Sequence, residues 1–185
     1  IRLSYVGELG WELYVPNQYG HLLWETIWEA GVPAGLIAAG LGAFTSMRIE
    51  KGYRLWGTDI HTEYNPYEAG LKFVVRLNKG DFIGKDALID IKETGIERKL
   101  CCLTIEDSKS VVMGSEPVMF EDKILGFVTS ADYGYNIGKG IAYAYLPLKY
   151  SQPGTKLEIV YFDRRYSAIV SEEPLYDSEG EKMRI

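Results

Sequence analysis

Glu12 and Tyr5 are the residues of this sequence whose types and spacing point most directly to ligand chemistry. They flank the turn signal Gly-Glu-Leu-Gly at positions 7–10, which separates two strand-like runs. In a hairpin with this loop, Tyr5 faces Glu12 and shares its face with Leu3 and Tyr14, because side chains alternate along a strand. A carboxylate on such an aromatic surface can accept two parallel N–H bonds from a planar, amidine-like ligand edge. From spacing alone, a solvated glutamate on an edge strand is the favoured alternative.

The pattern around this segment predicts the elements that position it. The second face of the hairpin is apolar and is expected to face the core; its side chains are Val6, Trp11, Leu13 and Val15. Helices are expected from Asn17 to Gly31, from about Gly40 to Gly52 and over residues 84–93, and a strand over residues 72–77. Helices and strands thus mix over residues 1–95, which predicts an α+β layer.

Residues 96–185 differ from residues 1–95 in their sequence pattern, which is that of strands and turns. Short β-rich runs separated by turn signals cover residues 100–106, 116–120, 124–130, 140–146, 157–162 and 167–170. Several short strands with tight connections are typical of a small antiparallel barrel or sandwich. The aromatic stretch at 132–137 is expected to be a packed corner of this unit, and a loop that closes over a site is the alternative. The sequence therefore predicts two domains, residues 1–95 and 96–185.

Length, charge and cysteine usage narrow the class of protein. With 185 residues, of which 46% are hydrophobic, the chain can form one or two domains with a sizeable core. The net charge of -6 predicts no general attraction to nucleic acid or to an anionic membrane, and no apolar run approaches the length of a bilayer span. Cys101 and Cys102 point to opposite faces of a strand, so we expect neither a mutual disulfide nor a metal site. A reducing, intracellular compartment fits this usage. Because Ile1 stands inside an expected strand, we expect a fragment of a longer polypeptide.

Four motifs in matching order carry a resemblance to a known family. Positions 5–12 read Tyr-Val-Gly-Glu-Leu-Gly-Trp-Glu and resemble the Tyr-x-Gly-Glu-x-Gly-x-Glu signature of the glycine cleavage T-protein (aminomethyltransferase) family. Residues 47–59, 65–71 and 81–88 resemble the family's Leu-Arg-Leu-Glu-x-Gly with Gly-x-Asp, Thr-Pro-x-Glu-Ala-Gly-Leu and Asp-Phe-Ile-Gly-Lys-x-Ala-Leu motifs. More closely, the sequence resembles the folate-binding C-terminal portion of dimethylglycine and sarcosine dehydrogenases and oxidases.

The resemblance implies a fold and a ligand. Residues 1–95 are then the C-terminal half of a T-protein-like, folate-binding α+β domain, and residues 96–185 the small antiparallel β-barrel that follows it. In the family, the glutamate matching Glu12 holds the pterin ring of tetrahydrofolate, the tyrosine matching Tyr5 borders the same pocket, and Tyr53 matches a position near the folate tail. The family's catalytic aspartate precedes Ile1, so no catalytic residue is assigned in this chain.

One departure from the family pattern separates its branches. T-proteins carry an arginine in Ala-Arg-Asp-x-Leu-Arg-Leu-Glu that binds the folate's glutamate tail, and its counterpart here is Phe44. This substitution favours the dimethylglycine or sarcosine branch. Within the same motif, and without the family, Arg48 and Glu50 are expected to form surface or inter-helix ion pairs. Asp59 and Asp81 match other motif positions and receive no catalytic role.

The function implied by the resemblance is one-carbon transfer to bound tetrahydrofolate, within a flavin-dependent enzyme that oxidises dimethylglycine or sarcosine. FAD is expected in the full-length protein but not on this fragment, which alone is expected to be inactive. The expected partners are folate and a methylated glycine, with no nucleic acid and no membrane, in the cytoplasm or, in a eukaryote, the mitochondrial matrix. The alternatives are a T-protein that takes an aminomethyl group from a lipoyl carrier protein, and a non-catalytic regulatory protein of the same architecture.

Overall fold

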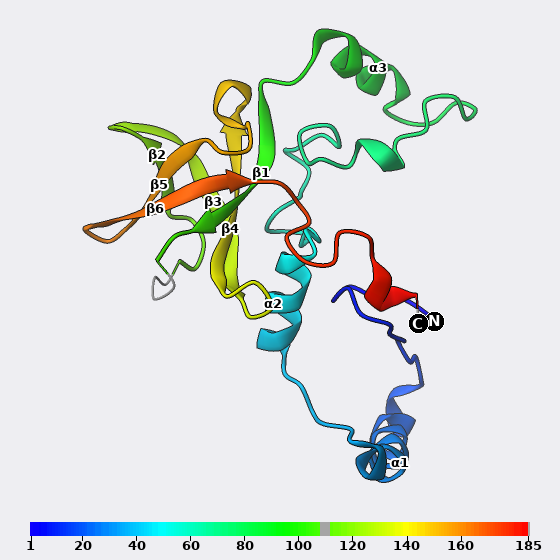
Figure 1. Ribbon diagram of the computed structural model, residues 1–185. Helices are drawn as coiled ribbons and strands as arrows, with labels where there is room; N and C mark the ends of the chain where they lie inside the picture. The colour runs from blue at the N-terminus through cyan, green and yellow to red at the C-terminus, as the bar shows by residue number, and fades with distance from the viewer. Residues whose placement is uncertain (108–111, 185) are drawn as a thin grey trace.

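The computed structural model describes residues 1–107 and 112–184, and these form an α+β fold (Figure 1). The helices are α1 (Gly20–Gly31), α2 (Leu41–Glu50) and α3 (Lys85–Thr94), and the strands are β1 (Arg98–Ile105), β2 (Pro117–Phe120), β3 (Lys123–Gly134), β4 (Lys139–Pro147), β5 (Lys156–Tyr161) and β6 (Arg164–Ser171). Short 3-10 turns lie at Asn17–Tyr19, Val32–Ala34, Lys72–Val74, Leu148–Tyr150 and Glu181–Met183. The predicted fold class, helices and barrel strands are confirmed, with β3 and β6 longer than expected.

The strands close into an antiparallel barrel in the order β1-β4-β3-β2-β5-β6, and the pairing of β1 with β6 completes the ring. Alternation along β1 explains how the barrel joins the rest of the chain. Cys101, Leu103 and Ile105 point into the barrel core, whereas Leu100 and Cys102 belong to a second buried cluster with Ile49 of α2. Strand β1 therefore contributes side chains to two buried clusters. Of the two predicted forms, barrel and sandwich, the structure has the antiparallel barrel.

The two cysteines face opposite ways, as the sequence predicted, and both are free and buried. Burial raises the pKa of the Cys101 thiol to about 11 and that of the Cys102 thiol to about 12. Since the thiolate is the reactive form, both thiols are unreactive at neutral pH.

We expect neither Cys101 nor Cys102 to react with a thiol reagent such as iodoacetamide at pH 8 while the protein is folded, because both are buried and protonated. Unfolding in guanidinium chloride should make both react fully. Mass spectrometry of the peptide that contains them measures the difference. Rapid labelling of this peptide in the native protein would contradict the burial of both thiols.

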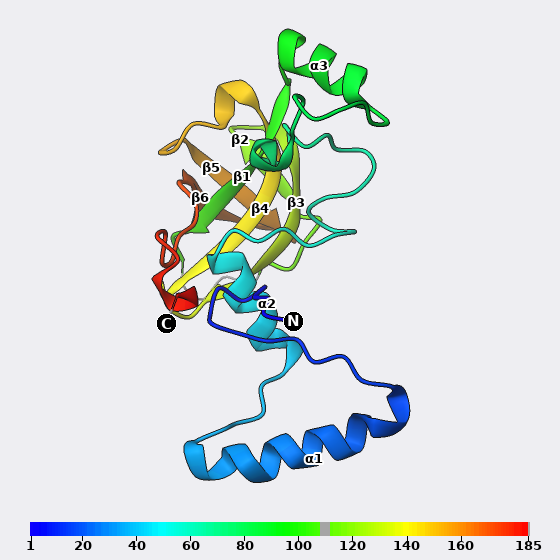
Figure 2. The ribbon, with the colours of Figure 1, turned by 90° about the vertical axis from the view of Figure 1, so that its right-hand side faces the viewer.

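Helix α2 lies along the outside of the barrel (Figures 1 and 2), and polar contacts join it there in addition to the packing of Ile49. Arg48 is 2% exposed and its Nη1 donates to Asp59 Oδ2 at 2.7 Å. The other carboxylate oxygen of Asp59 accepts bonds from Thr129 and Ser130 of β3, each at 2.6 Å. This pair therefore connects the helix, the loop that follows it and the barrel. The expectation of a surface ion pair for Arg48 is wrong.

Glu50 is also buried and binds backbone rather than a cation. Its Oε1 accepts the amides of Asn136 and Ile137 at 2.7 and 3.2 Å, and its Oε2 accepts the Asn136 side-chain amide at 2.6 Å. The β3–β4 turn is thus held at the end of α2, so residues 132–137 form a corner of the barrel, although Tyr135 within it is 77% exposed rather than packed. The surface prediction for Glu50 fails because these amides are more than 80 positions away along the chain and leave no local signal.

Two predicted elements within residues 1–95 are wrong. Ile1 and Glu12 exchange backbone hydrogen bonds of 2.9 and 2.8 Å, so Glu12 is not paired with Tyr5 and the four-residue hairpin loop does not form. The amide of Leu9 instead donates to the carbonyl of Lys182 at 3.0 Å, which draws this segment to the end of the chain. The apolar face of the expected hairpin is not core either, since Trp11 and Leu13 are about 60% exposed.

The expected strand over residues 72–77 is a 3-10 turn, Lys72–Val74, followed by irregular chain. Phe73 is 72% exposed, so the alternating pattern does not mark a buried face there. The physical reason is that a strand needs a neighbour for its backbone groups, and the described residues place none beside this segment.

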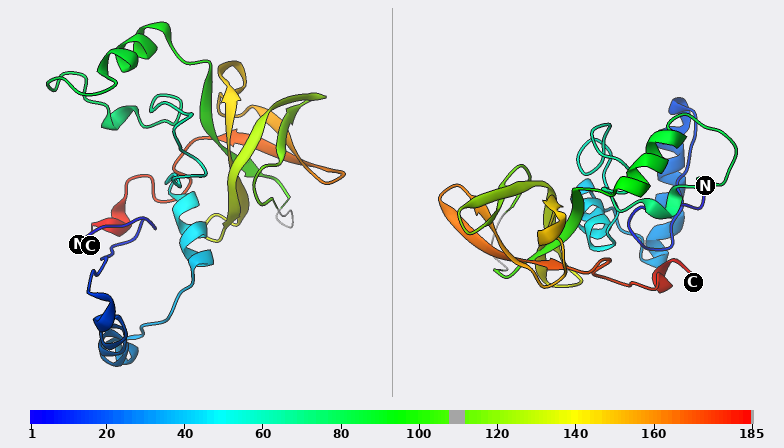
Figure 3. Two further views of the ribbon diagram at one scale, coloured as in Figure 1. Left: turned by 180° about the vertical axis from the view of Figure 1, so that it is seen from behind. Right: turned by 90° about the horizontal axis from the view of Figure 1, so that it is seen from above.

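Helices α1 and α3 stand away from the barrel in every view (Figures 1, 2 and 3). No residue of α1 is buried, and Trp24 and Trp28 stack on each other with ring centroids 5.9 Å apart.

Among the described residues, no helix has the length and apolar character that crossing a bilayer requires.

The buried pair of Arg48 and Asp59 yields a stability prediction. Asp59→Ala should lower the free energy of unfolding by about 3–5 kcal/mol, because it leaves the Arg48 guanidinium buried without its counter-charge. Adding Arg48→Met to that variant should restore part of the loss. Chemical denaturation of the single and double variants measures both effects.

Asp81→Ala is the matched control, because Asp81 is fully exposed and pairs only with Lys85 at 3.6 Å. Its effect should stay within about 0.5 kcal/mol. An Asp59→Ala variant as stable as the Asp81 control would show that the buried pair does not hold α2 to the barrel.

Candidate ligand-binding pocket

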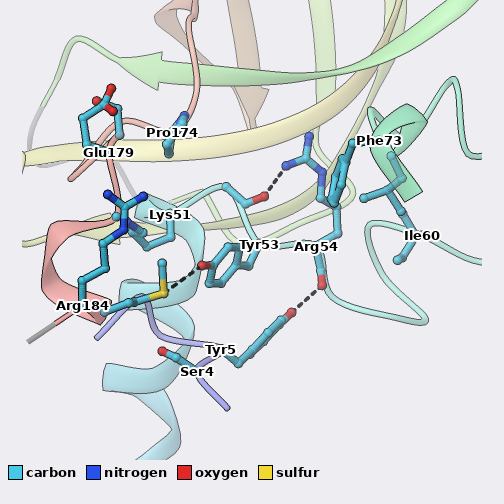
Figure 4. A pocket seen from close by; sticks show the side chains of 15 residues that line it. Ser4, Tyr5, Lys51, Tyr53, Arg54, Ile60, Phe73, Pro174, Glu179 and Arg184 are labelled. Carbon is cyan, nitrogen blue, oxygen red and sulfur yellow. Dashed lines mark hydrogen bonds between the residues drawn. The ribbon is translucent and has the colours of Figure 1, made fainter. Parts of the chain in front are cut away.

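A pocket of about 600 Å³ lies where four parts of the chain meet. Its walls come from the N-terminal segment, the end of α2 with the residues after it, the segment of Leu71 and Phe73, and the C-terminal segment (Figure 4). Its lining side chains include Tyr5, Lys51, Tyr53, Arg54, Glu179 and Arg184. Its size is in the usual range for a site that holds a small organic molecule.

Two of the three predicted binding residues are brought together in this pocket. The rings of Tyr5 and Tyr53 stack with centroids 5.9 Å apart and planes 23° apart, and the ring of Phe44 lies 5.1 Å from that of Tyr5. The Tyr5 hydroxyl donates to the Arg54 carbonyl, and the Tyr53 hydroxyl lies 3.4 Å from the sulfur of Met183. Burial raises the pKa of Tyr5, which keeps this hydroxyl protonated as a donor. The rings are therefore fixed by bonds at their hydroxyl ends and form an apolar wall.

Glu12, the third predicted residue, is not among the residues that line this pocket. It is half-buried, and its Oε2 accepts the hydroxyl of Tyr14. This hydrogen bond, together with the carboxylate charge, raises the pKa of Tyr14. The carboxylate thus keeps acceptor capacity on Oε1 and stands beside an aromatic ring, although a different one from Tyr5. The role of Glu12 stays a prediction.

The cations at the end of α2 are neutralised by the C-terminal segment. Lys51 Nζ lies 2.9 Å from Asp177 Oδ2 and donates to the Asp177 carbonyl at 2.6 Å. The Arg54 guanidinium contacts Glu173 Oε1 at 2.5 Å, and the other oxygen of Glu173 accepts the hydroxyl of Tyr143 at 2.7 Å. The hydrogen bond from Lys51 lowers the pKa of Asp177. These contacts hold the C-terminal segment against the pocket.

Sequence reasoning missed this C-terminal contribution. Lys51 and Asp177 are 126 positions apart, and Arg54 and Glu173 are 119 apart. No local motif marks such a pairing. The sequence contains one chemical signal. Lys51 and Arg54 lie close together after a helix, and cationic side chains are rarely buried without a carboxylate partner.

Gly7 allows the N-terminal segment to pass close to Lys51. Its φ of +75° lies in the left-handed region, and a Cβ there would stand 2.2 Å from Lys51 Cγ. The stem of Lys51 cannot move away freely, because its ammonium group is held by Asp177. A glycine is therefore required at this crossing.

Gly7→Ala should destabilise the protein by about 2 kcal/mol, through the left-handed backbone and the displacement of Lys51. Limited proteolysis should also cut the C-terminal segment faster in this variant. Gly20→Ala is the control, since Gly20 has an ordinary helical φ and open space around it. Equal stability and equal proteolysis of the two variants would contradict the close crossing.

The described residues contain no group of three or more histidine, cysteine, aspartate or glutamate side chains suited to a metal ion. His61 packs its ring 4.4 Å from that of Tyr64, and His21 faces Glu25 on the surface of α1. The described side chains of the pocket offer aromatic rings, hydrogen-bonding groups and charges.

Comparison with known proteins assigns both parts of the chain to domain families. Residues 1–79 match the GCVT N-terminal domain, and residues 98–177 match the glycine cleavage T-protein C-terminal barrel domain. This pair of domains defines the class of protein, and the closed barrel described above is its second member.

Individual relatives agree with this class. The mitochondrial dimethylglycine dehydrogenase of Homo sapiens is 40% identical over 186 residues, covering 100% of this chain and 22% of that protein. An aminomethyltransferase of Symbiobacterium thermophilum is 42% identical over 178 residues, covering 96% of this chain and 47% of that protein. The crystal structure of the glycine cleavage system aminomethyltransferase T from Bartonella henselae superposes with a TM-score of 0.87 at 25% identity, over 96% of this chain and 49% of that one.

The chain therefore belongs to the glycine cleavage T-protein family, and it is homologous to part of the dimethylglycine dehydrogenases. It spans less than half the length of each of these relatives.

Proposed function

We propose that this chain is the tetrahydrofolate-binding, one-carbon-transfer portion of a flavin-dependent enzyme that oxidises dimethylglycine or sarcosine. The observation that carries the proposal is the joint placement of Tyr5 and Tyr53, two residues from different family motifs, as one aromatic wall of a pocket of about 600 Å³. Stacked aromatic rings offer a flat, apolar surface that suits a heteroaromatic ligand.

The carboxylate of Glu12 supplies the second part of the proposal. An amino-pyrimidine edge presents a ring N–H and an amino group side by side, and a carboxylate accepts both. Glu12 has a hydroxyl partner in Tyr14 and retains an oxygen for a ligand. It follows Tyr5 closely along the same irregular segment, whose path is set by contacts at Gly7 and Leu9.

In this proposal the chain binds and orients the folate, and the oxidation belongs to a FAD-containing part of the whole protein. That part would take two electrons from the N-methyl group onto FAD, and tetrahydrofolate bound here would take up the resulting iminium carbon, releasing the demethylated amine and giving methylene-tetrahydrofolate. Tyr5, Tyr53 and Glu12 fix the ligand, and no side chain of this chain is assigned as the catalytic acid or base. Asp59 is unsuited to that role, because it is 1% exposed and its oxygens are occupied by Arg48 and β3.

Aminomethyl transfer is the second candidate, since the relatives include an aminomethyltransferase at 42% identity beside the dehydrogenase at 40%. Phe44 favours the first candidate. Its ring packs on Tyr5, so this position offers an apolar contact rather than a cation for a ligand carboxylate. Assays of the full-length protein for sarcosine or dimethylglycine oxidation and for aminomethyl transfer separate the two.

The proposal predicts that tetrahydrofolate quenches the tryptophan fluorescence of the full-length protein, and that Glu12→Ala weakens its binding about a hundredfold. The loss corresponds to about 3 kcal/mol for two charge-assisted hydrogen bonds. Titration of both proteins under anaerobic conditions measures the two dissociation constants.

Glu8→Ala is the matched control, because Glu8 is a glutamate of the same segment that takes no part in the proposed ligand contacts. It should bind tetrahydrofolate with the affinity of the unmodified protein. An Glu12→Ala variant that binds as tightly as this control would remove the folate assignment.

A further inference from the structure

One buried polar atom in the wall of the pocket has no partner. Over residues 1–107 and 112–184, Ser4 Oγ is the one buried side-chain nitrogen or oxygen that makes no hydrogen bond. Buried polar groups are almost always hydrogen-bonded, because an unpaired group keeps the full cost of leaving water. Ser4 lies beside Tyr5 and lines the pocket (Figure 4). The unpaired hydroxyl is therefore at the pocket and not in the core of the barrel.

The tyrosine hydroxyls of the aromatic wall are already engaged. The Tyr5 hydroxyl donates to the Arg54 carbonyl, and the Tyr53 hydroxyl lies 3.4 Å from the sulfur of Met183. Neither tyrosine can serve Ser4 without giving up the contact that fixes its ring. Within the described part of the chain, Ser4 is thus the uncommitted buried hydroxyl of this wall.

The buried cations of the pocket are committed as well. The Arg54 guanidinium donates from Nε to the Ala69 carbonyl at 3.2 Å and contacts Glu173 Oε1 at 2.5 Å. Lys51 Nζ is held by the carboxylate of Asp177 at 2.9 Å. These groups face protein partners, whereas the Ser4 hydroxyl faces none.

The backbone around Ser4 is fixed on both sides. Arg2 donates from Nη2 to the Met183 carbonyl at 3.0 Å, and Tyr5 is attached through its hydroxyl to the Arg54 carbonyl. Ser4 therefore gains no partner by moving its main chain. Its hydroxyl can still turn among the staggered positions on Cβ, and no bond of the free protein holds it in one of them.

We propose that the Ser4 hydroxyl donates a hydrogen bond to a carbonyl oxygen of the heteroaromatic ring system bound against Tyr5 and Tyr53, and so orients that ring. The inference rests on the proposed function, because it needs such a ring at this wall. The carboxylate of Glu12 can only accept, so it serves the N–H groups of the ring and not a ring carbonyl, whereas a hydroxyl can donate. Binding then gives the hydroxyl the partner that it lacks in the free protein, and this gain adds to the affinity.

Ser4→Ala distinguishes a ligand contact from a structural one by two measurements. Dissociation constants of tetrahydrofolate and of tetrahydropterin, which keeps the ring carbonyl and lacks the tail, are measured on the full-length protein under anaerobic conditions. Loss of one hydrogen bond to the ring should weaken both ligands by the same factor, about tenfold. The melting temperature of the unliganded variant should be unchanged or higher, because the substitution removes a buried hydroxyl that has no partner.

Ser151→Ala is the matched control. Ser151 is 6% exposed and donates its hydroxyl to the Leu148 carbonyl at 2.9 Å, and it does not line the pocket. This variant should lower the melting temperature, because it removes a hydrogen bond that exists in the free protein, and it should leave both dissociation constants unchanged. The two serine variants are thus expected to separate binding from stability.

The outcomes separate the inference from the function beneath it. Unchanged binding of both ligands to Ser4→Ala, or weaker binding of tetrahydrofolate alone, would overturn the inference and leave the folate site standing. A melting temperature lowered as far as in Ser151→Ala would also overturn it, because the Ser4 hydroxyl would then have a partner in the free protein. If the unmodified full-length protein binds neither ligand, the proposed function and the inference fall together.

Discussion

The buried contact between Arg48 and Asp59 is the constraint on which the rest of this structure depends. A guanidinium and a carboxylate that are almost fully excluded from water must satisfy each other, and their remaining bonds reach the Tyr53 carbonyl, the Leu55 amide and two hydroxyls of β3. The pair therefore dictates the path of the chain as it leaves α2. That path places Tyr53 and Arg54 at the pocket. The geometry of this pocket wall therefore depends on an ion pair whose two residues do not line the pocket.

The pocket is a composite of chain segments that are remote in sequence. The residues after β6 run from the barrel back to the end of α2, where Lys51 and Arg54 meet Asp177 and Glu173. The first residues of the chain reach the same place, because the Leu9 amide binds Lys182. A closed barrel makes this return possible, since β6 ends beside β1 and directs the following chain outward. The barrel therefore influences the pocket through the chain that leaves β6, and not through the side chains in the barrel interior.

The pocket combines aromatic side chains and charged side chains from both ends of the chain. Phe44 makes an aromatic contact beside Tyr5, while Arg184 brings a guanidinium to the same pocket from the other end of the chain. Tyr53 lies between the two, with its ring on Tyr5 and its hydroxyl on Met183.

The sequence by itself determined the barrel strands and the three helices, because alternation, helical periodicity and turn residues are local signals. The resemblance of short motifs to a known family added Tyr5 and Tyr53 as candidates for one site, and their rings do stack. Only the tertiary structure decided that Arg48 and Glu50 are buried, that residues 72–77 form no strand, and that Glu12 pairs with Ile1 rather than Tyr5. It alone also brought Arg184 to the pocket. These features depend on contacts between residues more than ten positions apart. The energies of such contacts cannot be estimated from a short stretch of neighbouring residues.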